Sequence, residues 1–158
     1  MISVVIPTLN AEAGLSECLS ALVPATVDGL IREVIVVDGG STDRTLRIAD
    51  QAGARVVASE KGRGGQLREG ARAARFGWFL FLHADTVLQP GWEREAAALI
   101  DRVEDGRRRE TAAAFRFALD DLGFMPRMVE RGVGLRCAIL GLPYGDQGLL
   151  IPRRLYEG

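Results

Sequence analysis

Two observations predict an α/β fold in a single domain, with a mainly parallel sheet flanked by helices. Four short, β-prone apolar runs, at 2–6, 33–37, 54–59 and 78–82, alternate with segments in which apolar residues recur at helical spacing. This alternation is typical of parallel strands joined by right-handed helical crossovers. The chain has 158 residues, 47% apolar and 26% charged, which suffices for one hydrophobic core. We therefore expect one domain over residues 1–158.

The first two predicted strands are each followed by a turn and a helix. After the strand at 2–6, Asn10 is the expected N-cap of a helix whose apolar residues lie on one side: Leu15, Cys18, Leu19 and Leu22. The strand at 33–37 leads to a second helix, which Ser41 or Thr42 would cap and which continues to residue 52. Both units therefore have the order strand, turn, helix.

The pattern continues with the strands at 54–59 and 78–82. Between them lie a glycine-rich loop, "KGRGG" at 61–65, and a helix at 65–75. Pro90 is expected to start the next helix, whose apolar stripe should pack on the sheet: Trp92, Ala96, Leu99, Ile100 and Val103. Beyond it we expect an exposed turn at 105–110, a strand at 112–119, a helix at 124–140 and, within 145–152, a turn and a short last strand.

Charge and hydropathy exclude two classes of partner. The net charge is −1, so the general attraction to phosphate that nucleic-acid-binding domains use is missing, and we expect no nucleic acid. No apolar run approaches the roughly 20 residues that span a bilayer, and the start "MISVVIPT" lacks the character of a signal peptide. We expect no transmembrane segment, a cytoplasmic location and at most peripheral contact with a membrane. Cys18 and Cys137 form no CxxC motif, and buried free thiols are the simplest interpretation.

Three turns should meet at one edge of the sheet, because each follows a strand: "PTLNAE" at 7–12, "DGGSTD" at 38–43 and "HADT" at 83–86. In an open parallel sheet, ligands gather beyond the carboxyl ends of the strands. Helix N-termini and acidic side chains around one crevice suit a nucleotide. The GxGxxG of a dinucleotide site and the GxxxxGK[ST] of a P-loop are both absent, so NAD binding and a P-loop NTPase are disfavoured.

Individual residues in these turns have suitable chemistry. Asp38 at a strand end can accept hydrogen bonds from a base or ribose, and Gly39 and Gly40 let the backbone approach a ligand closely. A tight turn with an aspartate cap explains the same residues equally well. Arg63 in the glycine-rich loop is a candidate phosphate contact, whereas the arginines of the following helix could equally form a solvated face.

With these motifs assembled, the chain resembles a family 2 glycosyltransferase of the GT-A fold, which has a Rossmann-like sheet. The segment "VVIPTLNAE" looks like that family's opening motif, "EVIVVDGGSTDRT" like its second-strand motif and "FLHADT" like its metal-binding D-x-D. The resemblance covers essentially the whole chain, most clearly residues 2–86. The segment "GRGGQLREGA" followed by "FLHADT" looks most like the small bacterial branch often called glycosyltransferase-like transferase 2.

The resemblance implies a donor site built from these turns. The residues that would hold the nucleoside and its phosphates are Pro7, Thr8, Asn10, Glu12, Asp38, Gly39, Gly40, Arg63, His83 and Ala84. Asp85 would bind the Mg²⁺ or Mn²⁺ that bridges the donor diphosphate, since a hard cation needs only one or two protein carboxylates beside the phosphates. His83 stands where the family has the first acid of D-x-D. Its imidazole can hydrogen-bond a ribose hydroxyl or the diphosphate, and a satisfied structural histidine is the alternative.

The resulting hypothesis is metal-assisted transfer of a sugar from a nucleotide-diphosphate donor to an unknown acceptor. The family suggests an inverting displacement, which needs a carboxylate base; Asp146 is the best acidic candidate, although a turn-forming aspartate would look the same. The alternatives are a nucleotidyltransferase, whose glycine-rich loop with Arg and Lys is missing after the first strand, and a catalytically idle nucleotide-binding domain. The sequence stops before the Glu-Asp motif of the family, so we expect a chain that lacks its C-terminal part and transfers sugar slowly.

Overall fold

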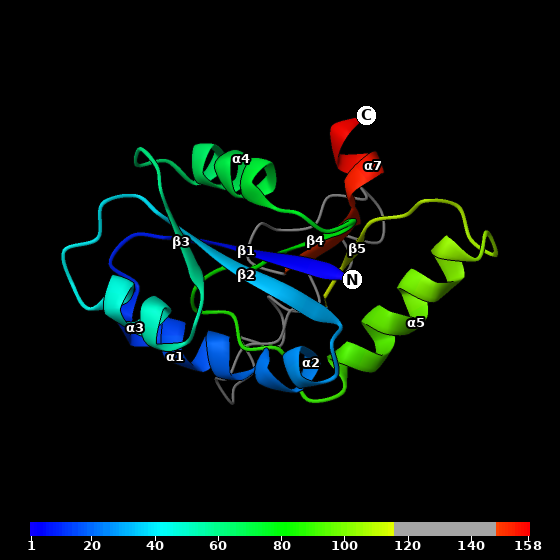
Figure 1. The fold of residues 1–158 in the computed structure, drawn as a ribbon, viewed down its shortest axis with the longest axis horizontal. Coiled ribbons are helices and arrows are strands. Elements are labelled where there is room, and N and C mark those ends of the chain that lie inside the picture. The colour runs from blue at the N-terminus through cyan, green and yellow to red at the C-terminus, as the bar shows by residue number, and fades with distance from the viewer. Residues whose placement is uncertain (116–147) are drawn as a thin grey trace, which may run out of the picture.

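The computed structural model describes residues 1–115 and 148–158, which form a sheet covered by helices on both faces (Figure 1). The strands are β1 (Ile2–Thr8), β2 (Ile31–Asp38), β3 (Arg55–Ala58), β4 (Trp78–Phe81), β5 (Ala113–Ala114) and β6 (Leu149–Pro152). The helices are α1 (Glu12–Ser20), α2 (Val23–Val27), α3 (Thr45–Gln51), α4 (Arg63–Ala73), α5 (Trp92–Glu104) and α7 (Arg153–Glu157). Helices α1, α2, α3 and α5 cover one face, and α4 and α7 cover the other. The predicted fold class is confirmed.

The described strands form one sheet in the order β3-β2-β1-β4-β6-β5. Strands β1 to β4 are parallel, whereas β6 runs antiparallel to both of its neighbours. Thr8 lies beside Asp38 in this register, and Val5 lies beside Phe81. The chain therefore leaves β1, β2 and β4 at the same edge of the sheet, as the sequence predicts for the three turns.

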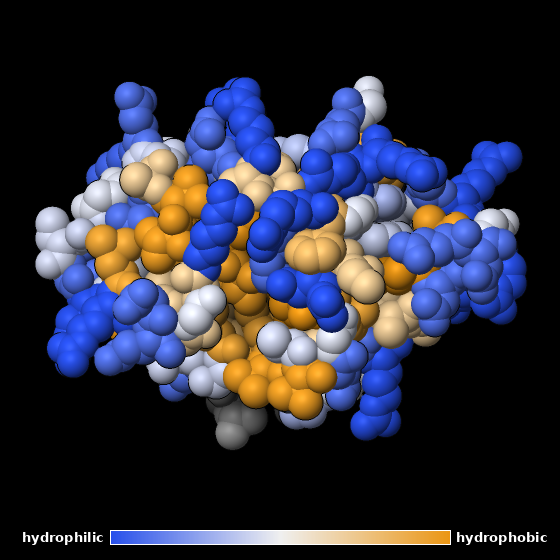
Figure 2. Space-filling model, viewed as in Figure 1, coloured by the Kyte–Doolittle hydropathy of each residue, from blue (hydrophilic) through white to orange (hydrophobic). Residues whose placement is uncertain are grey.

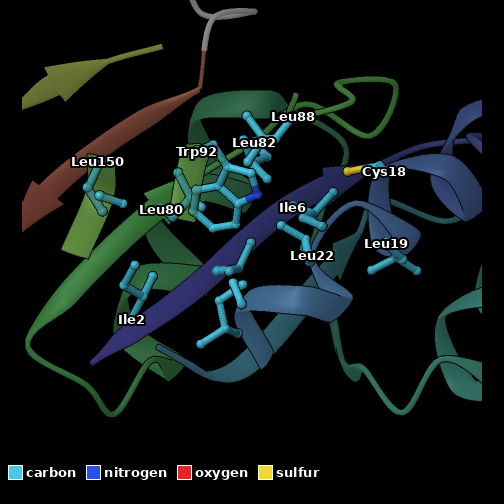
Figure 3. Packing of buried hydrophobic residues seen from close by; sticks show 14 of the residues in the cluster. Ile2, Ile6, Cys18, Leu19, Leu22, Leu80, Leu82, Leu88, Trp92 and Leu150 are labelled. Carbon is cyan, nitrogen blue, oxygen red and sulfur yellow. The ribbon is translucent and has the colours of Figure 1, made fainter. Parts of the chain in front are cut away.

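The central strands are buried because helices cover both of their faces. All seven residues of β1 and all four of β4 are buried. Figure 3 shows the larger core cluster, in which Ile6 and Leu80 of the sheet pack with side chains of α1 and α5. The predicted apolar stripes are confirmed by the buried residues Leu15, Cys18, Leu19, Leu22, Trp92, Ala96, Leu99 and Ile100, with Val103 partly buried.

On the other face, α4 lies unusually close to the sheet. A Cβ atom on Gly70 would come 2.2 Å from Val5 Cγ1 and 3.0 Å from Val37 Cγ2. The absence of a side chain at this position thus lets α4 rest directly on β1 and β2. This close approach brings the first turn of α4 under the carboxyl ends of the same two strands.

Two of the predicted helix caps are wrong. The N-cap residue of α1 is Ala11, and that of α3 is Arg44. Asn10, Ser41 and Thr42 therefore cap neither helix. Asn10 has a φ of +51°, outside helical geometry. The polar side chains of these loops make contacts between the loops instead.

Two further helix starts differ from the prediction. Helix α4 begins at Arg63, which is therefore helical and not part of the preceding loop. Helix α5 begins at Trp92 and not at Pro90, because Gly91 adopts a left-handed conformation with a φ of +96°. The five residues of α7 are too few to show a helical period, and the sequence did not indicate this helix.

The end of the chain is described in part. Strand β6 agrees with the predicted last strand, and β5 occupies two residues of the strand expected at 112–119. The predicted helix at 124–140 and Cys137 lie outside the described residues. Over residues 1–115 and 148–158, no helix has both the length and the apolar character needed to cross a membrane.

Figure 2 shows apolar surface between charged side chains on one face of the domain. One apolar groove, of about 500 Å³, runs between α1, α2 and α3 and is lined by residues that include Leu19, Val23, Val27, Ile31 and Ile48. It opens beside the first residues of β2. The groove is therefore separate from the edge of the sheet where the three turns emerge.

Candidate functional site

The candidate site begins with a pair of neighbouring strand ends. Thr8 ends β1 and Asp38 ends β2, and the Thr8 hydroxyl donates a hydrogen bond of 2.9 Å to Asp38 Oδ1. Both residues are buried, with 2% and 5% of their surface exposed. The pair fixes the point at which the two loops leave the sheet.

The carboxylate of Asp38 organises the turn that follows it. Its Oδ2 accepts hydrogen bonds from the backbone N–H groups of Gly40 (2.9 Å) and Ser41 (2.8 Å), and its Oδ1 accepts one from the Ser41 hydroxyl besides that of Thr8. Burial raises the pKa of Asp38, but the hydrogen bonds from Ser41, Gly40 and Thr8 outweigh it and hold the pKa below 3.8. The left-handed φ of Gly40, +96°, lets the backbone fold around this carboxylate. A ligand donor could reach Asp38 only in place of one of these four partners.

The loop after β1 is bound to the loop after β2 by reciprocal hydrogen bonds. The Asn10 N–H donates to Ser41 Oγ (2.8 Å), and the Thr42 N–H donates back to Asn10 Oδ1 (2.8 Å). The Ala11 N–H donates to Thr45 Oγ1 (2.8 Å). Each loop thus satisfies backbone donors of the other, which a helix N-terminus would otherwise leave without partners.

Glu12 continues this exchange at the start of α1. Its N–H donates to Asp43 Oδ2 (3.1 Å), and its Oε2 accepts the Arg44 N–H (2.9 Å) and Arg44 Nε (3.3 Å). These hydrogen bonds from Arg44 hold the pKa of Glu12 below its ordinary value of 4.5. The side chains of Asn10 and Glu12, both predicted to bind the nucleoside, therefore join the two loops into one unit.

A buried amide beneath these loops was missed by the sequence analysis. Gln66 of α4 is 4% exposed, and its Nε2 donates to the backbone oxygens of Thr8 and Val37, each at 2.8 Å. A signal was present in the sequence, because Gln66 is a polar residue one helical turn before Gly70 on the side of α4 that faces the sheet.

The third turn carries His83 and Asp85 beyond β4. The His83 Nδ1 and Asp85 Oδ1 atoms are hydrogen-bonded to each other, and the Thr86 N–H donates to the His83 carbonyl (3.1 Å). The Asp85 side chain is 70% exposed and that of His83 is 36% exposed. The carboxylate that the sequence assigns to a metal is thus open to solvent, with an imidazole beside it.

Helix α1 supports this turn from behind. A Cβ atom on Gly14 would come 2.9 Å from Asp85 Cα, so the helix backbone contacts the turn directly. One helical turn further on, the Cys18 thiol approaches the His83 carbonyl oxygen at 3.5 Å. Burial, with a smaller contribution from the negative charge of Asp85, raises the pKa of Cys18 to about 12, so it stays a neutral donor. Helix α1 therefore connects the first loop, at its N-terminus, to the turn with Asp85.

The donor atoms of this turn suit one kind of cation. In the parts of the chain that the structure describes, three or more His, Cys, Asp or Glu residues do not gather into a complete metal-binding cluster. A cation that takes one or two protein ligands and completes its shell with phosphate oxygens and water, as Mg²⁺ does, needs only an exposed carboxylate such as Asp85. The residues present fit a divalent cation that arrives with a diphosphate.

The remaining predicted site residues lie around this edge. Pro7 is buried within β1 and Ala84 is buried between His83 and Asp85, so their side chains belong to the packing. Arg63 is exposed in the first turn of α4. Asp146, the predicted base, lies outside the described residues.

A groove of about 570 Å³ lies between the β3–α4 connection and the outer side of α4. Its lining includes Lys61, Arg68 and Arg72, and Arg72 is paired with Glu69 at 2.7 Å. Arg75, the last arginine of this segment, is paired instead with Glu33 at 3.0 Å. Arg72 in α4 and Arg75 beyond the end of that helix therefore have different acidic partners.

Comparison with known proteins agrees with this geometry. A sequence model described as "Glycosyl transferase family 2" matches residues 3–122. A PGL/p-HBAD biosynthesis glycosyltransferase of Mycobacterium bovis is 38% identical over 95 residues, which are 56% of this chain and 36% of that protein. Glucosyl-3-phosphoglycerate synthase of Mycobacterium tuberculosis is 50% identical over 60 residues, 38% of this chain and 18% of that protein. The chain thus spans about a third or less of the length of these two relatives.

The solved structures give the same result over nearly the whole chain. The crystal structure of glucosyl-3-phosphoglycerate synthase from M. tuberculosis with UDP matches with a TM-score of 0.68 and 26% identity, covering 98% of this chain and 57% of that one. The structure of the same enzyme with Mn²⁺ and UDP-glucose matches with a TM-score of 0.69 and 26% identity, over 98% and 57% of the two chains. The family model covers well over half of this sequence. On this basis, the chain belongs to glycosyl transferase family 2.

Proposed function

We propose that this chain binds a nucleotide-diphosphate sugar and takes part in transferring the sugar to an acceptor. The observation that carries the proposal is the joining of three strand-end turns at one edge of the sheet by α1. The N-terminus of α1 is tied to the Asp38 turn, and its Gly14 contacts the turn of Asp85. In this proposal, α1 holds a nucleoside site at the Asp38 turn beside a diphosphate-metal site at the Asp85 turn, as a nucleotide-diphosphate donor requires. The similar enzyme that has been solved with UDP, Mn²⁺ and UDP-glucose supports the same donor chemistry.

On the nucleoside side, the proposal assigns two kinds of role. Pro7, Thr8, Asn10, Glu12 and Asp38 shape the walls of the site, because their described contacts are with the protein itself. The backbone of the exposed Gly40 and of the half-buried Gly39 is left to face the base and ribose. Arg63, exposed at the start of α4, supplies positive charge toward the phosphates.

On the metal side, Asp85 would hold a Mg²⁺ or Mn²⁺ ion together with the donor diphosphate. Such a cation stabilises the negative charge that develops on the departing diphosphate. His83, whose Nδ1 is hydrogen-bonded to the Asp85 carboxylate, orients that carboxylate, and its other ring nitrogen can accept a hydrogen bond from a ribose hydroxyl.

The proposed reaction is an inverting displacement at the anomeric carbon of the sugar, with a carboxylate that removes the proton of the acceptor. Asp146 is the candidate for this base. The membership in glycosyl transferase family 2 favours this reaction over a nucleotidyltransferase. A catalytically idle binding domain would bind the donor without turning it over, and this property distinguishes it from a glycosyltransferase.

The proposal is tested by titrating the chain with UDP and with GDP in a calorimeter, with and without Mn²⁺, and by following hydrolysis of UDP-glucose. Binding of one nucleotide that strengthens with Mn²⁺ is expected. Binding without any release of glucose would identify an idle domain, and the absence of binding to both nucleotides would contradict the donor site itself.

A further inference from the structure

The carboxyl ends of β1 and β2 carry two buried backbone oxygens, on Thr8 and Val37. Thr8 is 2% exposed, and its carbonyl accepts the Gly39 N–H at 2.9 Å. The Val37 carbonyl, on the neighbouring strand β2, accepts the Thr8 hydroxyl at 3.5 Å. A carbonyl oxygen has two lone pairs, so each of these acceptors can take a further donor from elsewhere in the protein.

Gln66 supplies both donors from one side-chain amide. Its Nε2 lies 2.8 Å from Thr8 O and 2.8 Å from Val37 O. Since both partners are carbonyls, which only accept, the NH₂ group and not the amide oxygen must face them. The planar NH₂ group of Gln66 therefore bridges one oxygen on each strand at the ends of β1 and β2.

The same amide supports the turn after β2. A Cβ atom on Gly39 would come 3.2 Å from Gln66 Nε2 and 3.4 Å from Gln66 Cδ, so the Gly39 backbone lies directly on the amide. The Gly39 N–H and the Gln66 amide also share the Thr8 oxygen as acceptor. Any displacement of Gln66 is therefore passed to the backbone that follows Asp38.

We propose that Gln66 is a positioning residue of the donor site, which acts through Thr8 and Gly39 and does not touch the donor. The effect of Gln66 on ligand binding rests on the proposed function. Its effect on the Gly39 backbone is a property of the free protein. With the amide removed, the Gly39 backbone loses its contact with Gln66, although Gly39 keeps its hydrogen bond to Thr8 and Asp38 keeps those that fold the turn.

The decisive variant is Gln66→Met, which keeps the length of the side chain and removes both hydrogen bonds. Its matched control is Ala71→Gly, a change at another buried position of α4 that lowers stability without removing a contact to the loops. Two quantities are measured on each folded variant: the hydrogen exchange of the Gly39 amide in the free protein and the Kd for UDP. A purely structural role would make both variants behave alike at equal loss of stability.

For Gln66→Met we expect about tenfold faster exchange at Gly39 and about tenfold weaker UDP binding, as the loss of two hydrogen bonds implies, with a smaller effect in Ala71→Gly. The gain in UDP affinity from Mn²⁺ should persist, because the turn of Asp85 is held by α1. Equal exchange and equal UDP affinity in the two variants would overturn the inference. If the unmodified chain does not bind UDP, the proposed function fails, and the exchange at Gly39 alone then decides whether Gln66 positions the loop.

A second variant, Gln66→Glu, separates the hydrogen bonds from the volume of the side chain. A carboxylate cannot donate to Thr8 O or Val37 O, but a protonated carboxyl can donate to one of them. The ratio of its Kd for UDP to that of the unmodified chain should therefore fall as the pH is lowered toward the pKa of the carboxyl. A ratio that does not change with pH would contradict the assigned hydrogen bonds.

Discussion

Gly14 in α1 lies directly against Asp85, so that a Cβ atom at position 14 would come 2.9 Å from Asp85 Cα and 3.0 Å from Asp85 Cβ. The close contact involves backbone atoms, which cannot move aside as the end of a flexible side chain can. We predict that Gly14→Ala displaces the Asp85 turn, at a cost of about 1–3 kcal/mol in the free energy of unfolding. The increase in UDP affinity on addition of Mn²⁺ should shrink, while the affinity without metal stays close to its original value. Calorimetric titration of UDP at two Mn²⁺ concentrations measures both.

The chain contains a matched control for this substitution. Gly64 also lies in a helix, but no atom outside its own helix and neighbouring residues lies within 4 Å of a Cβ placed there. Gly64→Ala should leave the Mn²⁺ effect unchanged and raise the helix stability slightly. Should both alanine variants bind UDP and Mn²⁺ alike, the contact between Gly14 and Asp85 has no functional role.

Removal of the Asp85 carboxylate should abolish most of the metal dependence. We predict that Asp85→Ala weakens Mn²⁺-dependent UDP binding by at least about tenfold, since even the partners of metal ligands contribute that much. Stability should change little, because the side chain is 70% exposed. Asp101→Ala, at an exposed position of α5, is the control. A variant at Asp85 whose affinity still rises with Mn²⁺ as in the unmodified chain would exclude this residue as the ligand.

Asp38 should matter first for the stability of the turn. The Asp38→Ala variant leaves four donors, on Thr8, Gly40 and Ser41, without their acceptor. We predict a loss of about 2–4 kcal/mol in the free energy of unfolding, measured with urea, together with weaker UDP binding. Asp38→Asn, which keeps one acceptor oxygen, should lose less of both. Normal stability in Asp38→Ala would show that the four hydrogen bonds contribute little.

Protonation of Glu33, which is remote from the site, should lower the free energy of unfolding at acidic pH. Its carboxylate accepts the Ser3 hydroxyl (2.7 Å) and the Arg75 N–H (2.6 Å) and pairs with Arg75 Nε (3.0 Å). Burial raises the pKa of Glu33, but these hydrogen bonds outweigh it and bring the pKa below 4.5.

A carboxyl group with a lowered pKa in the folded state stabilises the protein above its ordinary pKa and loses this contribution as the pH falls through the folded-state value. We therefore predict that the free energy of unfolding decreases below pH 4.5 and that Glu33→Gln flattens this decrease. Urea unfolding over a pH series measures it, with the exposed Glu17→Gln as control. Parallel curves for the Glu33 variant and the unmodified chain would contradict the assignment.

The strands were the most predictable part of this fold. The run at 78–82 is wholly apolar because β4 is buried on both faces, and burial of that kind leaves a direct mark on the sequence. The antiparallel direction of β6 could not be read in the same way, because the pattern of a short buried strand is the same in both directions. The meeting of the three turns followed from the parallel order of β1, β2 and β4 alone.

The roles of single polar residues were less predictable. Asn10 and Ser41 are suitable caps by type, but each bonds to the other loop, 31 residues away in the sequence. Local patterns contain no information on such partners. Gln66 was overlooked for a related reason, since a glutamine in a helix is usually solvated and only the closeness of α4 to β1 makes it a buried donor.

The exchange of hydrogen bonds between the loops after β1 and β2 has a consequence for how such sequences can diverge. Position 10 must offer an acceptor to the Thr42 N–H, and position 12 must offer one to the Arg44 N–H. Replacing either side chain with an apolar one removes the acceptor of a backbone group in the other loop. An insertion in one loop would move its hydrogen-bonding groups away from their partners in the other loop. Among relatives with this site, the two loops should therefore keep their lengths together, and residues at positions 10 and 12 should change in step with the conformation of the segment at 41–45.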